Sequence, residues 1–581
     1  MKLIPQAIDN YVTIIKDNYY FFDKTAYIAT VEREKNFILL VRPRRMGKTL
    51  FSSMLMTYYD INYRDQFQEL FGGLAIGKNP TPLANSFLTL RFDFSHVTSD
   101  IDLLEKSFTE YCKGQIWLFF KRYSSIYTEE EKSQILGALT VKGALVNLVE
   151  LTHLKGHKIY LFIDEYDNFT NLVLAAHGVK AHEEITHGDG FYRDFFKGCK
   201  GTFDRIYMTG VSPVTYDDIT SGFSIGGVVA LNPRFDQAIG VTETELRAMI
   251  DYYREQGCYE RSTDEIVAEM KPWYDNFCFS LDSYGKAPTI YNTSMVWRYM
   301  NEMVLSGQPP KQMLDRSART DPKNLNFLVM SEDLENREER IEIIKDICVK
   351  GYTTGEVKEE FQACDAGDED NFKSLLYYYG TLTFGGRDAL GFPKLIVPNK
   401  TMGDLYLGYL MQMIEQEGFR LNGRRKKLEE AIQDAAVSGQ WRQMVMDVGT
   451  LCKDYSSLRN ANQGEASVQA FARGLLCLNP YFDVWPELEL NLGYSDILLI
   501  PKGTEHCPTR YSYLIELKYM NMRDKLSDRY VKEACEQLDR YSRDVHLRGS
   551  ALLRGSKLIC LYMIFRNQRL VDKGEYKPKN L

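Results

Sequence analysis

Short apolar runs recur along the first 240 residues, with helical spacing of apolar positions between them. Continuous runs of this length are typical of buried strands, and their alternation with helices predicts a parallel α/β sheet. Five strands are predicted, at Phe37–Val41, Phe87–Phe94, Ile159–Ile163, Arg205–Thr209 and Val228–Leu231. Polar residues follow several of these runs, so a site is expected at the carboxyl edge of the sheet.

A helical middle region is predicted next, because apolar residues take helical spacing through most of residues 241–355. Within residues 340–400, one helix precedes two short strands joined by a glycine-rich turn. These elements lie at Asn371–Tyr379, Thr381–Phe384 and Lys394–Val397. The order predicts a winged helix that packs as a lid on the nucleotide domain, with DNA binding as the alternative. Residues 401–460 are predicted to be helical again.

The pattern changes near residue 460 to helix, strands, helix and strand. The predicted segments are a helix at Asn462–Leu478, strands at Phe482–Leu490, Ser495–Pro501 and Tyr511–Lys518, a helix at Leu526–Arg543 and a last strand at Lys557–Phe565. The sequence therefore predicts an α/β multidomain protein. Its expected parts are a parallel-sheet domain at 1–240, a helical and winged-helix region at 241–400, a helical connector at 401–458 and an α/β domain at 459–581.

Composition limits the partners and the cellular location that we expect for the protein. The net charge of −8 does not attract nucleic acid as a whole, so any such contact needs a local basic surface, for which Arg424–Lys427 is the best candidate. A solvated helix face is the alternative for that run. Eleven scattered cysteines without a CxxC pair indicate reduced thiols in a cytoplasmic protein. Neither a secretory signal nor a membrane span is visible, so we expect no membrane partner.

A phosphate-binding loop is predicted between the first strand and the next helix. It ends in Gly47, Lys48 and Thr49 at the start of an apolar helical run. In such a loop the backbone N–H groups and the helix dipole face an anion, the lysine reaches the outer phosphates, and the threonine hydroxyl ligates Mg²⁺. Arg42 stands where the usual pattern has glycine, so an arginine-rich surface loop is the alternative. Arg45 is a further candidate for a phosphate contact, unless it pairs with nearby acids or faces a neighbouring domain.

A second segment of the nucleotide site follows the third strand, where Asp164 and Glu165 succeed five apolar residues. This arrangement is typical of a Walker B segment. Asp164 would hold Mg²⁺, directly or through water, and Glu165 would polarise the attacking water. The alternative is a buried strand that ends in a solvated acidic turn. Next to it, Thr209 or Ser212 is a candidate to sense the γ-phosphate, with a plain strand-to-loop turn as the alternative.

Three of the eight histidines lie between residues 175 and 190, at His177, His182 and His187. Their five-residue spacing does not align them on one helix face. We therefore expect a polar loop that acts as a mobile lid, with metal binding as the minor option.

Several motifs together resemble the bacterial AAA-ATPase-like proteins. They are Asp23-Lys24-Thr25, Arg42-Pro43-Arg44-Arg45-Met46-Gly47-Lys48-Thr49, Asp164-Glu165-Tyr166-Asp167, Thr209-Gly210-Val211-Ser212-Pro213, Ser221-Gly222-Phe223 and Trp273-Tyr274-Asp275-Asn276-Phe277. The arginine-rich loop is characteristic of that family, so the resemblance implies that Arg42 is normal there. It also implies a C-terminal domain of the PD-(D/E)XK nuclease class.

The residues near the C-terminus carry a candidate divalent-metal site. Asp496 and Glu516 lie on neighbouring predicted strands, and their carboxylate oxygens suit Mg²⁺ or Mn²⁺. Lys518 shares a strand face with Glu516 because it lies two residues later. The metal would activate a water, and the lysine would orient that water or stabilise charge on the phosphate. The alternative is a structural strand pair with a surface ion pair.

The resemblance adds two supporting residues and one departure. The PD-(D/E)XK fold often keeps an acidic residue on the preceding helix, where this chain has Glu465, and Gln-x-x-x-Tyr on the following helix, where it has Gln537. The family commonly has Gly-Arg-x-Asp before the first metal ligand, whereas Tyr494 replaces that arginine here. This replacement removes the phosphate contact that the arginine would make, but it leaves the metal ligands unchanged.

These residues predict a protein that binds and hydrolyses ATP and controls a metal-dependent nuclease domain. The expected cofactors are ATP and Mg²⁺, with Mn²⁺ as an option at the nuclease site. The expected partners are nucleic acid, DNA rather than RNA, and further copies of the chain in a homo-oligomer. The alternative is an ATP-dependent signalling or assembly switch whose nuclease-like domain binds nucleic acid or a partner without cleaving. A metabolic P-loop kinase is a third option, although no acceptor site is visible.

Overall fold

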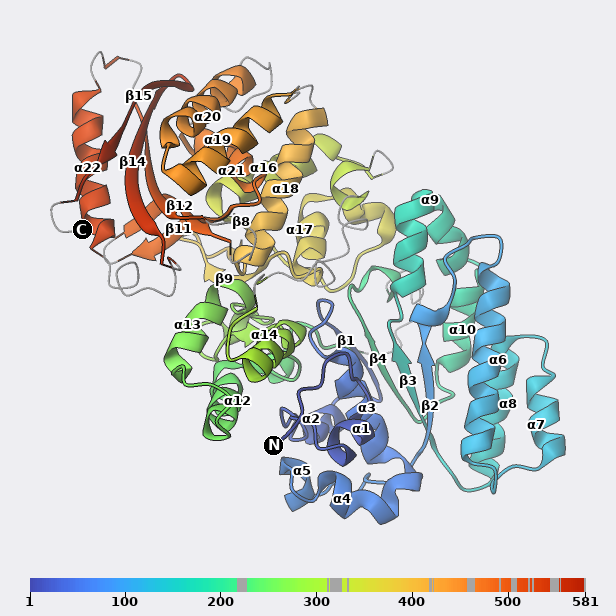
Figure 1. The fold of residues 1–581 in the computed structure, drawn as a ribbon. Helices are drawn as coiled ribbons and strands as arrows, with labels where there is room; N and C mark the ends of the chain where they lie inside the picture. Colours follow the sequence, from blue (N-terminus) through green and yellow to red (C-terminus); the bar gives the residue numbers. More distant parts are fainter. Residues whose placement is uncertain are drawn as a thin grey trace. The chain divides into compact units, whose positions relative to one another are not determined.

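The chain folds into two compact units, coloured along the sequence in Figure 1. The first comprises Met1–Pro309, Asp315–Arg340 and Thr354–Pro398, and the second comprises Pro310–Leu314, Ile341–Thr353 and Asn399–Leu581. The computed structural model describes residues 1–216, 227–310, 313, 327–331, 334–416, 419, 421, 423–456, 465–490, 493–502, 509–520, 523–524, 527–543, 553 and 555–578. The motif Ser221-Gly222-Phe223 lies outside these residues. Within them, no helix is long and apolar enough to cross a membrane.

A five-stranded parallel sheet forms the centre of the first unit, as predicted. Its order is β2-β3-β4-β1-β5. The strands are β1 (Phe37–Val41), β2 (Leu88–Asp93), β3 (Ile159–Asp164), β4 (Arg205–Gly210) and β5 (Gly227–Val228). Every residue of β1 and β3 is buried, which explains why these strands are continuous apolar runs instead of alternating ones.

Helices flank this sheet and follow its strands in the chain. They are α1 (Tyr11–Lys16), α2 (Tyr27–Arg33), α3 (Lys48–Tyr59), α4 (Phe67–Phe71), α5 (Ala75–Lys78), α6 (Leu104–Arg122), α7 (Glu129–Leu136), α8 (Val141–Leu154), α9 (Asn168–Thr186) and α10 (Phe191–Cys199).

The predicted polar loop at residues 175–190 is wrong, because α9 continues as a helix to Thr186. Gly178 interrupts the helix with a φ of 82°, so the apolar positions on either side of it fall out of phase. This break hides the helical period from the sequence. His182 is completely buried and lies 3.3 Å from the Thr215 hydroxyl oxygen, and burial lowers its pKa to about 3. The buried ring is therefore neutral.

The rest of the first unit is mainly helical, as predicted for the middle region. It contains β6 (Val241–Thr242), α12 (Glu243–Glu255), α13 (Thr263–Tyr274), β7 (Ile290–Tyr291), α14 (Thr293–Ser306), α17 (Glu369–Tyr378), β9 (Thr383–Arg387) and β10 (Pro393–Ile396). Thr242 and Ser262 form capping boxes that start α12 and α13. β9 and β10 pair as an antiparallel hairpin after α17, the order expected for the wing. The chain passes between the two units at α16 (Arg337–Lys350) and β8 (Tyr352–Thr354).

The second unit contains a five-stranded mixed sheet in the order β11-β12-β13-β14-β15. Its elements are α18 (Lys400–Gln416), α19 (Arg424–Ser438), α20 (Trp441–Ser456), α21 (Glu465–Cys477), β11 (Phe482–Leu490), β12 (Gly493–Pro501), β13 (Tyr511–Tyr519), α22 (Asp528–Ser542), β14 (Lys557–Arg566) and β15 (Arg569–Tyr576). β13 and β14 are parallel and the other pairs are antiparallel. In Figure 1, α22 covers one face of this sheet, and α19 and α20 lie on the other.

The sequence predicted Lys557–Phe565 as the last strand, but β15 adds an edge strand beyond it. β15 is mostly exposed or half-buried and carries charged residues along its length. Edge strands of this kind lack an apolar run, which is why the pattern did not reveal it.

Candidate nucleotide and metal sites

The nucleotide-site segments meet at the carboxyl edge of the first sheet. Lys48 lies at the start of α3 and donates to the carbonyls of Arg42 and Pro43, at 3.0 and 3.1 Å. Its Nζ is also 4.0 Å from a carboxylate oxygen of Glu165. Gly47 has a φ of +103°, a conformation that side-chain-bearing residues rarely adopt. The loop geometry therefore depends on this glycine.

Asp164 is the buried acid of the site, with a side chain only 1% exposed. Burial raises its pKa to about 6, while the nearby Arg91 guanidinium and a hydrogen bond with Thr49 act in the opposite direction. The register of β2 and β3 places Asp93 directly beside Asp164. The structure thus brings Lys48, Thr49, Asp164 and Glu165 together, as a Mg²⁺–nucleotide site requires.

The turn after Asp164 is held in an unusual conformation. Glu165 has a φ of +49°, which is uncommon for a residue other than glycine. Asp167 is completely buried and accepts hydrogen bonds from the backbone N–H groups of Val211 and Ser212. The Tyr166 hydroxyl donates to the Ser212 carbonyl. The acidic turn is therefore fastened to the loop that follows β4.

The two γ-phosphate sensor candidates differ in their hydrogen bonding. The Thr209 hydroxyl donates to the Leu40 carbonyl on β1 at 2.8 Å and is completely buried. The Ser212 hydroxyl is also buried, but it has no hydrogen-bond partner among the described residues. The Thr209 hydroxyl thus bonds β4 to β1, whereas the Ser212 hydroxyl makes no such bond in the described part of the chain.

Arg42 is buried rather than presented to a phosphate. Its guanidinium donates to the carbonyls of Val41, Ala230 and Phe235 at 2.8–2.9 Å and lies 4.3 Å from the ring centre of Phe279. Carbonyl oxygens and an aromatic face surround this buried cation, although its Nε has no hydrogen-bond partner among the described residues. The arginine that replaces glycine therefore anchors the loop to the residues after β5 and to the segment that holds Phe279.

The remaining loop residues also contact the helical part of the first unit. The Thr293 hydroxyl, at the start of α14, donates to the Met46 carbonyl at 2.6 Å. The backbone N–H of Ser294 donates to the Arg45 carbonyl at 3.2 Å. A Cβ added to Gly380 would lie 2.7 Å from Pro43, so loop and chain approach closely there. The Arg45 side chain is exposed.

The nuclease-site residues converge on β12 and β13 of the second unit. Lys518 Nζ is 2.7 Å from one oxygen of Glu516. The other oxygen of Glu516 is buried and has no hydrogen-bond partner in the described part of the chain. Burial and the charge of Asp496 raise the pKa of Glu516 well above its usual value, against the opposing effect of Lys518. An unsatisfied carboxylate oxygen beside a second carboxylate fits a divalent cation.

Asp496 is oriented by two donors. The backbone N–H of Leu517 donates to Oδ2 at 2.7 Å, and Gln469 Nε2 donates to Oδ1 at 3.0 Å. Sequence reasoning gave Gln469 no role, although it lies one helical turn after Glu465 on α21 and so shares its face. Glu465 itself starts α21, and its side chain lies outside the described ones. The side-chain oxygen of Gln537 is buried without a partner among the described residues.

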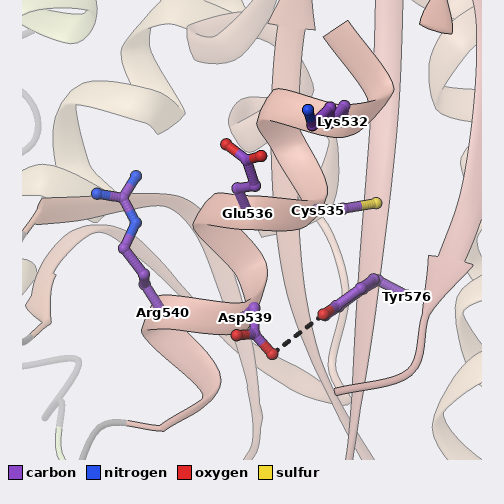
Figure 2. Close-up of a pocket in the computed structure, with 6 residues that line it drawn as sticks. All are labelled: Lys532, Cys535, Glu536, Asp539, Arg540 and Tyr576. Carbon is purple, nitrogen blue, oxygen red and sulfur yellow. Dashed lines mark hydrogen bonds between the residues drawn. The ribbon is translucent and has the colours of Figure 1, made fainter. Parts of the chain in front are cut away.

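A cavity of about 560 Å³ lies along α22, on the face of the helix that points away from the Asp496–Glu516 site. Figure 2 shows the residues that line it, which are Lys532, Cys535, Glu536, Asp539, Arg540 and Tyr576. The Tyr576 hydroxyl donates to Asp539 at 3.0 Å. Ala534, Leu538 and Tyr541 face the sheet instead. The cavity therefore does not belong to the Asp496–Glu516 site.

No group of three or more His, Cys, Asp or Glu side chains that could hold a metal ion occurs in the described ranges. The histidines of α9 thus do not form a metal site there. Each candidate site instead offers one or two carboxylates, which suits Mg²⁺ because this ion usually retains several waters.

Two family matches agree with this geometry. Residues 5–220 match the family described as predicted AAA-ATPase, and residues 463–575 match the PD-(D/E)XK nuclease superfamily. The chain thus carries an N-terminal region similar to the AAA-ATPase-like family and a C-terminal region similar to the PD-(D/E)XK nuclease superfamily, as its motifs predicted. One chain therefore combines an ATPase-like part with a nuclease-like part.

Individual relatives are distant. An uncharacterized protein in the vnfD 5' region of Azotobacter chroococcum mcd 1 is 23% identical over 284 residues, which is 48% of this chain and 48% of that protein. The chain thus matches about half the length of this curated relative.

Two solved structures are similar at a low level. Cdc6p from Pyrobaculum aerophilum has a TM-score of 0.22 and 11% identity, covering 68% of this chain and 90% of that chain. The Aeropyrum pernix ORC2 protein, in its ADPNP–ADP complexes, has a TM-score of 0.24 and 10% identity, covering 66% and 91%. Scores this low do not establish a shared fold, so the fold assignment depends on strand order and the family matches.

Proposed function

We propose that this chain binds and hydrolyses ATP in its first unit and thereby controls metal-dependent cleavage of a phosphodiester in its second. The observation that carries the proposal is the carboxylate pair at Asp496 and Glu516. One oxygen of Glu516 is buried without a partner in the described residues, although Lys518 is only 2.7 Å from the other. A buried, unsatisfied acceptor is costly in a purely structural strand pair and is useful in a cation site.

The first unit supplies the nucleotide chemistry. Lys48 contacts the outer phosphates once it leaves the loop carbonyls that it now donates to. Thr49 and Asp164 hold Mg²⁺, which offsets phosphate charge when bound. Glu165 orients and polarises the attacking water, and the exposed Arg45 is a further phosphate contact. Ser212, with its unsatisfied hydroxyl, senses the γ-phosphate more readily than Thr209.

The second unit supplies the nuclease chemistry. Asp496 and Glu516 hold Mg²⁺ or Mn²⁺, and an ion bound there lowers the pKa of its water and offsets charge on the phosphate. Lys518 holds Glu516 in place and stabilises the same charge. Gln469 fixes the orientation of Asp496, and Gln537 offers its unpartnered oxygen to the site.

DNA is the substrate class that we propose, with the basic run on α19 as a contact. These four side chains are exposed at the helix N-terminus. Ion pairs join Arg424 to Asp454, Arg425 to Glu429 and Lys426 to Glu430. Such exposed pairs contribute little and exchange readily for phosphate contacts.

Cleavage by the purified full chain tests the proposal. Single- and double-stranded DNA and RNA are incubated with EDTA, Mg²⁺ or Mn²⁺, with and without ATP. We expect DNA cleavage that needs the metal and falls by about 100-fold or more in Glu516→Gln, because an aligned metal site is lost. Glu536→Gln is the matched control, since this glutamate lines the cavity on the other face of α22.

The outcomes separate the candidate functions. Absence of cleavage under every condition, or full activity in Glu516→Gln, would refute the nuclease assignment. Metal-dependent binding of DNA without cleavage would support the signalling or assembly switch instead. Cleavage of RNA alone would retain the site and correct the substrate.

A further inference from the structure

Arg91 bridges two acids at the edge of the nucleotide site. It lies on β2, and its Nη2 is 3.2 Å from Asp93 Oδ2 and 3.2 Å from Asp164 Oδ2. Neither Arg91 nor Asp93 belongs to the predicted phosphate or magnesium residues. Yet the guanidinium contacts the carboxylate that the proposed function assigns to Mg²⁺, so its role bears directly on metal loading.

The two acids hold Arg91 in different ways. Asp93 is fixed in place, because its Oδ1 accepts from the backbone N–H and the hydroxyl of Ser95, at 3.1 and 2.6 Å. Its own backbone N–H donates to the Tyr111 hydroxyl at 2.7 Å. Asp93 is therefore held in position next to Arg91 by bonds that do not involve Asp164. Asp164, in contrast, would share its oxygens with any bound cation.

Both oxygens of Asp164 already have donors. Oδ1 accepts from the backbone N–H of Glu165 at 3.1 Å, and Oδ2 accepts from Arg91. A cation that binds Asp164 must therefore replace or share the Arg91 contact. Arg91 keeps its counter-charge when this happens, because Asp93 stays beside it.

We infer that Arg91 is the resident counter-cation of Asp164, that Mg²⁺ displaces it when the nucleotide site loads, and that Asp93 receives it. Arg91 is thus a positioning residue that sets the Mg²⁺ concentration at which nucleotide binds. In the metal-free site it also separates the like charges of Asp93 and Asp164, which the strand register places side by side. The inference depends on the proposed Mg²⁺–nucleotide site.

Two substitutions should shift Mg²⁺ binding in opposite directions. Binding of a fluorescent ATP analogue to the full chain is measured by anisotropy over a Mg²⁺ titration. In Arg91→Gln we expect the half-saturating Mg²⁺ concentration to fall about 3- to 10-fold, the effect of one ion pair, because the competitor is gone. In Asp93→Asn we expect it to rise by a similar factor, because Arg91 then remains with Asp164.

Arg91→Lys tests whether the contacts of Arg91, and not only its positive charge, set the Mg²⁺ dependence. It keeps the positive charge, but its ammonium nitrogen stands on a shorter side chain than the Nη2 that contacts both carboxylates. We expect a fall in the same direction as in Arg91→Gln, and the wild-type value would overturn the displacement inference. Arg122→Gln is the matched control with wild-type Mg²⁺ dependence, since Arg122 pairs with Asp60 and reaches Thr89 near the other end of β2.

Failure of the inference is distinguishable from failure of the site. Wild-type Mg²⁺-dependent binding with an unchanged titration in Arg91→Gln and Asp93→Asn would overturn the role of Arg91 alone. Wild-type chain that binds no nucleotide with Mg²⁺ would overturn the proposed site, and the inference with it. Thermal melts verify that each variant folds. If Arg91→Gln does not fold, the Mg²⁺ titrations of Asp93→Asn and Arg91→Lys test the role of Arg91.

Discussion

The main departure of this chain from the usual phosphate-loop pattern is Arg42, and its contacts explain why an arginine stands there. At the position of a glycine, Arg42 is 1% exposed, and its guanidinium donates to the carbonyls of Ala230 and Phe235 and lies over the face of Phe279. Lysine would not replace it, because only the planar fork reaches several acceptors while stacking on a ring. The arginine is therefore a structural residue of the loop, which leaves Lys48 and Thr49 for the phosphates.

Asp164→Asn should stabilise the metal-free protein above neutral pH. Burial raises the pKa of Asp164 from 3.8 to about 6, so the unfolded chain releases this proton at a lower pH than the folded protein does. The wild type loses stability as the pH rises from about 4 to 6, at most about 3 kcal/mol, and the amide avoids this loss. We expect a higher melting temperature for Asp164→Asn in EDTA at pH 7.5.

The pH dependence provides the control for this prediction. The gain should shrink toward pH 4, where wild-type Asp164 is protonated. Asp204→Asn is the comparison variant, since Asp204 pairs with His153 away from the site and is more exposed. A gain of the same size at pH 4 and pH 7.5 would contradict the assignment to ionisation of Asp164.

At the scale of elements, the phosphate-binding loop is joined to α14 as well as to the sheet. The Thr293 hydroxyl donates to the Met46 carbonyl, so Thr293→Val removes one buried hydrogen bond while keeping the shape of the side chain. We expect ATP affinity to fall about 3- to 10-fold, because loss of that bond loosens the loop. Calorimetric titration with ATP and Mg²⁺ measures the change.

Two further variants test the specificity of this effect. Thr293→Ser retains the hydroxyl and should restore wild-type affinity. Thr263→Val is matched in place, since Thr263 also begins a helix, is equally buried at 8% and bonds elsewhere, to Asp251. Unchanged affinity in Thr293→Val would show that α14 does not support the loop.

The sequence predicted the elements that bury their apolar residues in a regular order. Buried strands such as β1 and β3 are apolar runs, and the capping boxes at Thr242 and Ser262 mark helix starts directly. It did not predict β15, which is a polar edge strand, or the second half of α9, where Gly178 shifts the helical phase. These failures share a cause, since local periodicity carries no signal where burial is partial or interrupted.

The candidate sites were predictable to a similar extent. Lys48 and Asp164 have local motifs, and the fold brings them together as expected. Arg91, Thr293 and Gln469 have none, because their roles come from contacts with residues distant in the chain. The bond between Arg91 and Asp164 spans 73 positions, and that between Thr293 and Met46 spans 247. Only the three-dimensional fold supplies such pairs.

At the scale of the whole molecule, the two sets of site residues lie in different compact units. Lys48, Asp164 and Glu165 belong to the first, and Asp496, Glu516 and Lys518 belong to the second. In the proposed function, ATP binds the first set and acts on cleavage at the second set as an effector, which is a coupling between two sites.

The central claim is tested most directly by the initial rate of DNA cleavage with and without ATP, at constant free metal, in wild type and Lys48→Ala. Lys142→Ala is the control, since Lys142 pairs with Asp194 outside the site. We predict that ATP changes the wild-type rate about fivefold or more, as expected for coupled sites. Lys48→Ala should cleave at the ATP-free rate under both conditions. A wild-type rate that ATP leaves unchanged, or an equal response in Lys48→Ala, would contradict control of the nuclease domain by this nucleotide site.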